Sequence, residues 1–301
     1  MSGEGLAANI RHHYPKGALY AATLLLFLAN VLNIAADLGA MAAGTRLLLP
    51  SIQFELLVIL FALASLFLQI FMPYARYAKY LKYLALALLS YVAVALSIGL
   101  DWGDVFRHLL VPSMTFSKDQ ILLICAVLGT TISPYLFFWQ TSQEVEENIL
   151  HGERTIAERR ENSNRRSIRQ MRIDVWSGMF FSNLITFFIF AAVAGTLYAN
   201  GITDIVTADQ AALALQPFGQ FAFLLFALGI VGTGLLAVPV RAGASAYALA
   251  ESFGWVRGLH YKLKQAYAFY GVIIVSMMLG IAANFMHLDP IKMLIYAAVA
   301  N

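Results

Sequence analysis

The stretch from Gly129 to Gln140, GTTISPYLFFWQ, places polar chemistry inside a long apolar run. Proline removes a backbone hydrogen bond and clashes with the preceding turn, and glycine adds flexibility, so about one helical turn between Gly129 and Pro134 should open. In lipid, freed backbone is tolerated only where it lines a cavity or is buried in protein. Carbonyls at broken helices bind ions in many secondary transporters. The stretch therefore predicts ion ligands at a hinge, with a plain proline kink as the alternative.

Other polar side chains lie in the apolar runs. Asn30, Asn33 and Asp37 recur at i, i+3 and i+7, so they share one face of a helix. A carboxylate at membrane depth is costly and normally faces the bundle interior or water. Asp37 is therefore either part of a functional network or a structural residue, in a buried ion pair or as a hydrogen-bonded carboxyl with only a packing role. Asn183, in a later run, is a candidate for a hydrogen bond between helices.

The elements that hold these residues are membrane helices. The chain has 301 residues, of which 60% are hydrophobic and 12% charged, too apolar for a soluble domain of this size. Continuous apolar runs of membrane-spanning length predict an all-α polytopic membrane protein with a single domain over residues 1–301. We expect spans at about 18–49, 52–72, 80–100, 120–149 (broken near 129–134), 174–199, 217–252 and 266–286, with a partial span over 290–301.

Lysine and arginine residues predict the orientation. Only Arg46, Arg107, Lys118 and Lys292 fall on one side; the other basic residues, with Arg241 low on the sixth span, fall on the opposite side. Cytoplasmic loops carry an excess of Lys and Arg, so the N-terminus of this chain is predicted to be cytoplasmic.

The cytoplasmic side holds the charged loop 150–173 and the acidic end of the fourth span. The loop has no aromatic residue for base stacking, so it predicts contact with anionic lipid headgroups and no nucleic-acid partner. Glu144, Glu146 and Glu147 are expected to be solvated, where their charge attracts cations toward an inner mouth. The histidines all fall in loops or at helix ends, which argues against an intramembrane enzyme.

The segments NIAADLGAMAAG, GTTISPYLFFWQTSQEVEE, FFSNLITFFIF and LGIVGTGLLAVPV resemble the Nramp family of divalent metal transporters, in its bacterial branch. The resemblance implies a LeuT-type inverted-repeat bundle, of which this chain covers the third to ninth helices and the start of the tenth. It also implies a secondary transporter in the cell membrane of a bacterium. A divalent metal ion is then the transported substrate, and no resident cofactor is expected.

The family's broken sixth helix carries the pattern Ala-Xaa-Xaa-Met-Pro-His-Asn, whose methionine sulfur and a nearby carbonyl bind the metal. Aligned on Pro134, Thr130 stands at the carbonyl donor, Ser133 at the methionine and Tyr135 at the histidine. Asn301 falls near a tenth-helix amide that contributes to the metal site. A site with oxygen in place of the thioether suits hard ions such as Mg²⁺, as in the Nramp-related magnesium transporters.

Proton coupling is expected to be weak or absent. Asp37 matches the acid of the family's third helix, but the second acid, one turn later, is Ala40, and Tyr135 replaces the titratable histidine. Asn33, Asn183 and Tyr135 join Asp37 in a network that is either proton-conducting or structural, because a proton relay needs titratable groups in series.

The family's first helix carries Asp-Pro-Gly-Asn metal ligands, and this sequence holds nothing like them. The resemblance therefore implies a fragment, incomplete at both ends. Two alternatives stay open. One is a sodium-coupled transporter of an organic solute, with a pocket lined by Phe137, Phe138 and Trp139. The other is a fragment that transports nothing alone.

Overall fold

The computed structural model describes residues 2–72, 76, 79–81, 83, 85–112, 116–202, 207, 210, 212, 220–286 and 288–300, with the side chains of residues 222 and 300 left out. Every regular element in this part of the chain is a helix. Seven helical segments, with Lys118–Leu150 counted as one, are long and apolar enough to cross a membrane. Together with the apolar composition, this makes the chain a helical polytopic membrane protein.

Helices follow one another along the described part of the chain. They are α1 (Leu6–His13), α2 (Lys16–Leu48), α3 (Phe54–Phe71), the 3-10 helix η1 (Ala85–Leu88), α5 (Leu89–Ser97), α6 (Trp102–Leu110), α7 (Lys118–Thr131), α8 (Pro134–Leu150), α9 (Ile156–Glu161), α10 (Arg165–Thr196), the 3-10 helix η2 (Tyr198–Asn200), α12 (Gln220–Phe253), α13 (Tyr267–Phe285) and α14 (Pro290–Ala300). The predicted spans 80–100, 217–252 and 290–301 each include residues outside the described part: 82 and 84, 217–219, and 301.

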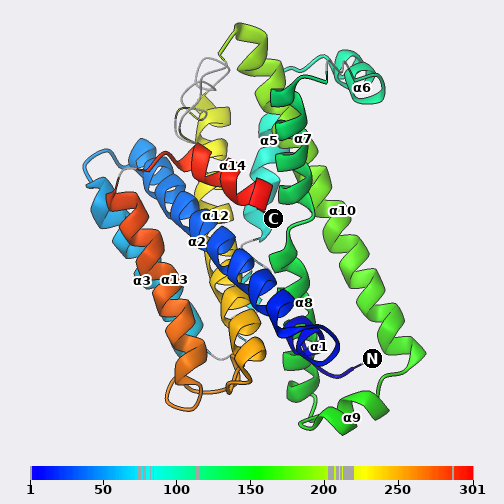
Figure 1. The fold of residues 1–301 in the computed structure, drawn as a ribbon. Coiled ribbons are helices and arrows are strands. Elements are labelled where there is room, and N and C mark those ends of the chain that lie inside the picture. The colour runs from blue at the N-terminus through cyan, green and yellow to red at the C-terminus, as the bar shows by residue number, and fades with distance from the viewer. Residues whose placement is uncertain are drawn as a thin grey trace.

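Helix α2 is the central element, and α12, α13, α14 and α3 all pack against it (Figure 1). The main core joins Leu38 and Met41 of α2 to Tyr247 of α12 and to Phe269 and Met277 of α13. A second cluster lies between α5, α10 and α12 and includes Tyr91 and Phe226. The polar face of α2 therefore lies against other helices of the bundle.

Helix α10 is longer than its predicted span, because it begins at Arg165 and not near residue 174. The Asn164 side chain accepts hydrogen bonds from the backbone N–H groups of Arg166 and Ser167, which caps the helix start. Its first two turns therefore extend the apolar span into the charged loop. In Figure 1, α10 (light green) stands at the edge of the molecule, and it packs against α5.

Candidate functional site

The helix carrying the GTTISP stretch is broken. Helix α7 ends at Thr131 and α8 begins at Pro134, with Ile132 and Ser133 between them. Pro134 takes the first position of α8, where its missing N–H leaves no hydrogen bond unmade. A proline alone does not break a helix here, since α12 continues through Pro239. At the break the residue before the proline, Ser133, adopts the extended backbone that a following proline favours.

Ser133 closes the end of α7 with its own side chain. It is 3% exposed, and its hydroxyl lies 2.8 Å from the carbonyl oxygen of Gly129 and 2.9 Å from that of Thr130. Pro134 has no N–H for the Thr130 carbonyl, so the Ser133 hydroxyl is the group that donates to this end of the helix. The hydroxyl oxygen still has lone pairs that could coordinate a cation. The Thr130 hydroxyl instead donates to the Ala126 carbonyl, at 2.9 Å.

Gly129 allows a close approach of α14 to the break. A Cβ atom at this position would collide with the carbonyl oxygen of Ala298, near the end of α14. A backbone crossing this tight requires glycine. Helix α14 therefore brings the last described turn of the chain against the end of α7. Asn301, the predicted third ligand, lies outside the described residues.

Arg241 connects Asp37 and Tyr135, two members of the predicted network. The Arg241 guanidinium donates from Nη1 to Oδ2 of Asp37. Its Cζ atom lies 5.5 Å from the centroid of the Tyr135 ring, within the range of a cation–π contact. Arg241, expected on the cytoplasmic side, has a largely buried side chain that pairs with a carboxylate inside the bundle. The arrangement joins α2, α12 and α8.

The asparagines of α2 divide into two roles. Asn30 donates to the Arg241 carbonyl (3.2 Å) and to the Ser245 hydroxyl (2.9 Å), which adds a second link from α2 to α12. Asn33 is buried and donates to the Ala29 carbonyl of its own helix at 2.9 Å. Oδ1 of Asn30 and Nε of Arg241 are buried and have no hydrogen-bond partner in the described part of the chain.

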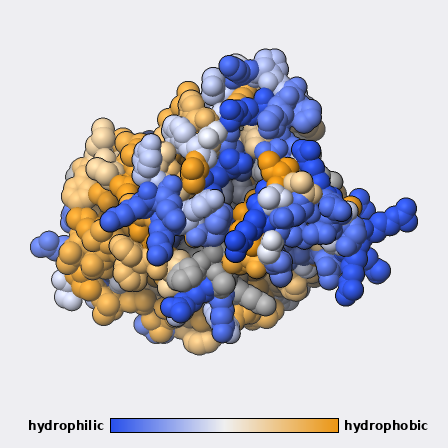
Figure 2. Space-filling view, turned by 90° about the horizontal axis from the view of Figure 1, so that it is seen from below, coloured by the Kyte–Doolittle hydropathy of each residue, from blue (hydrophilic) through white to orange (hydrophobic). Residues whose placement is uncertain are grey.

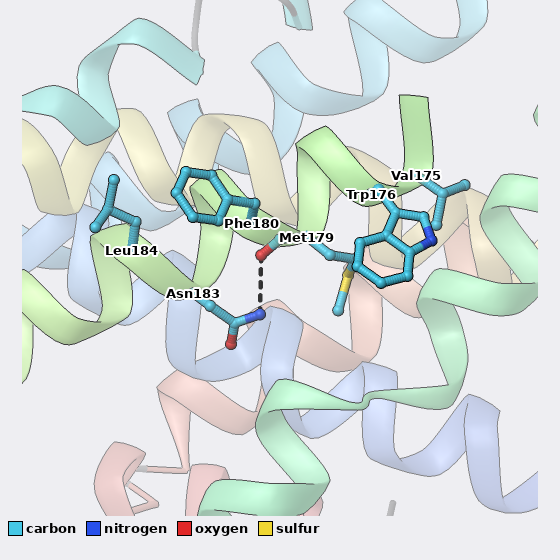
Figure 3. Close-up of a pocket in the computed structure, with 6 residues that line it drawn as sticks. All are labelled: Val175, Trp176, Met179, Phe180, Asn183 and Leu184. Carbon is cyan, nitrogen blue, oxygen red and sulfur yellow. Dashed lines mark hydrogen bonds between the residues drawn. The ribbon is translucent and has the colours of Figure 1, made fainter. Parts of the chain in front are cut away.

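Asn183 lies apart from the break. It is exposed on α10 and donates to the Met179 carbonyl of the same helix at 2.8 Å (Figure 3). It lines an open, mostly apolar pocket of about 500 Å³ whose lining comes from α10 alone: Val175, Trp176, Met179, Phe180, Asn183 and Leu184. In the described structure no hydrogen bond joins Asn183 to Asp37, Ser133 or Tyr135.

The acidic residues at the end of α8 were expected to be solvated, and for Glu146 this expectation was wrong. Glu146 is 1% exposed and not solvated. Its carboxylate accepts hydrogen bonds from the Tyr247 hydroxyl (2.5 Å) and the Leu259 N–H (2.8 Å), and it lies 2.6 Å from Nδ1 of His260. These partners come from α12 and from the loop after it. The carboxylate therefore fastens the C-terminal end of α8 to α12.

The break offers oxygen donors only. Its candidate ligands are the Ser133 hydroxyl and the Thr130 carbonyl, which suit hard cations such as Mg²⁺ more than soft ones. Among the described residues no group of three or more His, Cys, Asp or Glu side chains is placed to hold a metal ion.

The family model for "Natural resistance-associated macrophage protein-like" (Nramp) proteins matches residues 1–301, the whole of the chain. The chain belongs to the Nramp family. Bacterial relatives named divalent metal cation transporter MntH are similar to it: 29% identical over 246 residues in Pectobacterium carotovorum and 28% over 246 residues in Yersinia enterocolitica. Each alignment covers 79% of this chain and 56% of the relative. The chain therefore spans about half the length of the curated relatives that it matches.

Proposed function

We propose that this chain forms part of a pathway by which divalent metal cations cross the membrane, and that the break between α7 and α8 supplies ligands. The observation that carries the proposal is the interrupted helix inside an Nramp chain: at Ile132–Ser133 one half-helix ends and the next begins, within an apolar segment long enough to cross a membrane. Half-helix ends and unwound carbonyls bind ions in secondary transporters. The similarity to proteins named divalent metal cation transporters supports the same substrate class.

The proposed ligands are the Thr130 carbonyl and the Ser133 hydroxyl, with Asn301 as a third group, and Gly129 and Pro134 form the hinge. A cation that approaches the Thr130 carbonyl would replace the hydrogen bond from Ser133, and the hydroxyl would then turn a lone pair to the cation. Because neither donor is a soft sulfur, we propose a preference for hard ions such as Mg²⁺ over Mn²⁺ and Fe²⁺.

Transport is proposed to proceed by alternating access with little or no proton coupling. The Asp37 carboxylate is paired with Arg241, a fixed positive charge, and Tyr135 occupies the position of a titratable histidine. A proton relay needs titratable groups in series, and here the Asp37 carboxylate is engaged in an ion pair instead. Asn33 and Asn183, which donate to their own helices, have structural roles in this proposal.

We further propose that the protein lies in the inner membrane of a bacterium, with the start of this chain in the cytoplasm. The basic residues of the loop 150–173 support this orientation. Figure 2 views the face that carries α1 and α9, where hydrophilic residues gather, as expected of a surface in water and headgroups.

The experiment is uptake of Mn²⁺ into proteoliposomes that contain the purified chain, with Mg²⁺, Na⁺ and organic solutes as competitors. The proposal predicts that Mg²⁺ competes, and that an imposed pH gradient leaves uptake unchanged. Sodium-dependent solute uptake that divalent ions leave intact would instead support the organic-solute alternative.

A further inference from the structure

A second polar site lies far from the break, on the face seen in Figure 2. An open cavity of about 240 Å³ is lined by the C-terminal end of α8, the segment that leads into α9, α9 itself, the end of α12 and the loop that follows α12. Charged side chains of both signs line it, and most come from segments distant in the sequence. The proposed metal path uses none of them.

The acidic lining residues are already satisfied. Glu146 accepts from the three donors described above, and Glu251 is 3% exposed. Oε2 of Glu251 accepts from the Ala8 N–H at 3.1 Å, and Oε1 lies 3.3 Å from the Ser142 hydroxyl and 3.4 Å from Nε of Arg257. Each of the four carboxylate oxygens therefore already has at least one donor within the chain.

The basic lining residues still have donors to offer. The Arg154 side chain makes no hydrogen bond or ion pair within the described part of the chain, and Arg257 uses only Nε there. Arg159 is 9% exposed and donates from Nε and Nη1 to backbone carbonyls, including that of Gly3 at 2.8 Å. One of its terminal amino groups remains. Three guanidinium groups thus line one small cavity with unused N–H donors.

The electrostatics of Arg159 agree with this imbalance. Burial lowers the pKa of Arg159; the nearby Glu4, Glu153 and Glu158 oppose that shift, and repulsion from Arg257 adds to it. Two cations on different segments therefore lie close enough to destabilise one another. An anion between them would relieve the repulsion and accept the free N–H groups at the same time.

We propose that this cavity is a binding site for a single phosphate-type anion, held by the guanidinium groups of Arg154, Arg159 and Arg257. Guanidinium forks match the oxygen geometry of phosphate. The cavity is smaller than the roughly 300 Å³ at which pockets for drug-sized ligands begin, which favours one phosphate group. Its source is either an anionic lipid headgroup of the adjacent leaflet or free phosphate. Binding would tie the segment after α8 to the loop after α12.

The test is thermal unfolding of the purified chain in a neutral detergent, with inorganic phosphate titrated against chloride at constant ionic strength. A parallel arm uses phosphatidylcholine nanodiscs with and without phosphatidylglycerol. Arg154→Gln removes a lining guanidinium that is exposed and unpaired, so the fold should survive. Arg165→Gln is the matched control, because it removes the same charge from an exposed position on α10 that does not line the cavity.

We expect phosphate to raise the unfolding midpoint in a saturable way. Arg154→Gln should weaken the apparent affinity for phosphate by about tenfold, because a charge-assisted contact is lost. Arg165→Gln should leave that affinity unchanged. A rise in the unfolding midpoint with inorganic phosphate would show that the free anion is sufficient to occupy the site. A response only to phosphatidylglycerol identifies a lipid headgroup. The proposal is overturned if neither arm saturates, or if the two variants respond alike, since diffuse surface charge would then explain the effect.

Discussion

The guanidinium of Arg241 on α12 forms an ion pair with the carboxylate of Asp37 on α2, inside the apolar bundle. Both side chains are largely buried, with 14% and 16% of their surface exposed. The same guanidinium lies over the ring of Tyr135, the residue that follows Pro134 at the start of α8. The ion pair is therefore in contact with the broken helix. A change in its charge would alter the electrostatic potential beside the proposed metal path.

Breaking this pair should destabilise the protein strongly. Asp37→Asn or Arg241→Gln leaves one buried charge without its partner, and each should lower the free energy of unfolding by about 3–5 kcal/mol. The double variant Asp37→Asn/Arg241→Gln removes both charges and should lose clearly less than the sum of the two. A double-mutant cycle by chemical unfolding in mild detergent measures this difference. Strict additivity would show that the two side chains do not interact.

The close crossing of α14 and α7 makes Gly129 sensitive to one added methyl group. Gly129→Ala puts a Cβ against the Ala298 carbonyl and should cost about 1–3 kcal/mol, as overpacking typically does. Gly178→Ala is the matched control: it is a helical glycine with no atom within 4 Å of the added Cβ, so it should be neutral or stabilise by up to about 1 kcal/mol. The unfolding midpoints of the two variants test this difference in stability. Equal changes in midpoint for both variants would contradict the prediction.

The start of α14 should depend on pH through Asp289. Its side chain accepts from the backbone N–H groups of Ile291 (3.0 Å) and Lys292 (3.2 Å), and the hydrogen bond from Lys292 lowers the pKa of Asp289 below 3.8. A pKa that is lowered in the folded state gives a stabilising contribution that is present above the unfolded value and is lost as the pH falls through the folded value. Helix α14 should therefore lose protection in acid.

Hydrogen exchange of residues 290–300 checks this prediction. At neutral pH, Asp289→Ala should already exchange as fast as the wild type does only in acid. The comparison uses exchange rates corrected for the effect of pH on intrinsic amide exchange. Asp289→Asn should remain protected at both pH values, because asparagine also caps helices. A wild-type helix whose protection does not change with pH would contradict the proposed role of the carboxylate.

The parts of the site that depend on neighbouring residues could be predicted from the sequence. Gly129 and Pro134 lie five residues apart, and the order of a flexible residue followed by one that lacks an N–H indicated where the helix stops. The Ser133 contacts also stay within four residues of it along the chain. Local backbone rules decide such features, so a single sequence contains the information.

The parts that depend on distant residues could not be predicted. Arg241 lies 204 positions from Asp37, and its place low on an apolar span fitted a cytoplasmic role equally well. Glu146 has an acidic neighbour in sequence and resembled a solvated residue, but its partners Tyr247, Leu259 and His260 lie more than 100 positions away. Only a basic residue flanked by small apolar ones, in VPVRAGA, signalled that Arg241 sits inside the bundle.

The measurement that most directly tests the proposed metal path is the ratio of the Mn²⁺ and Mg²⁺ dissociation constants, by titration calorimetry, for the wild type and for Ser133→Met. Thr131→Met is the control, because it places a thioether two residues away at a position that is not a proposed ligand. Sulfur at the break should shift the ratio toward Mn²⁺ by about tenfold, or ~1.4 kcal/mol, and the control should not shift it. An unchanged ratio in Ser133→Met, with metal binding retained, would contradict the placement of the metal at the broken helix.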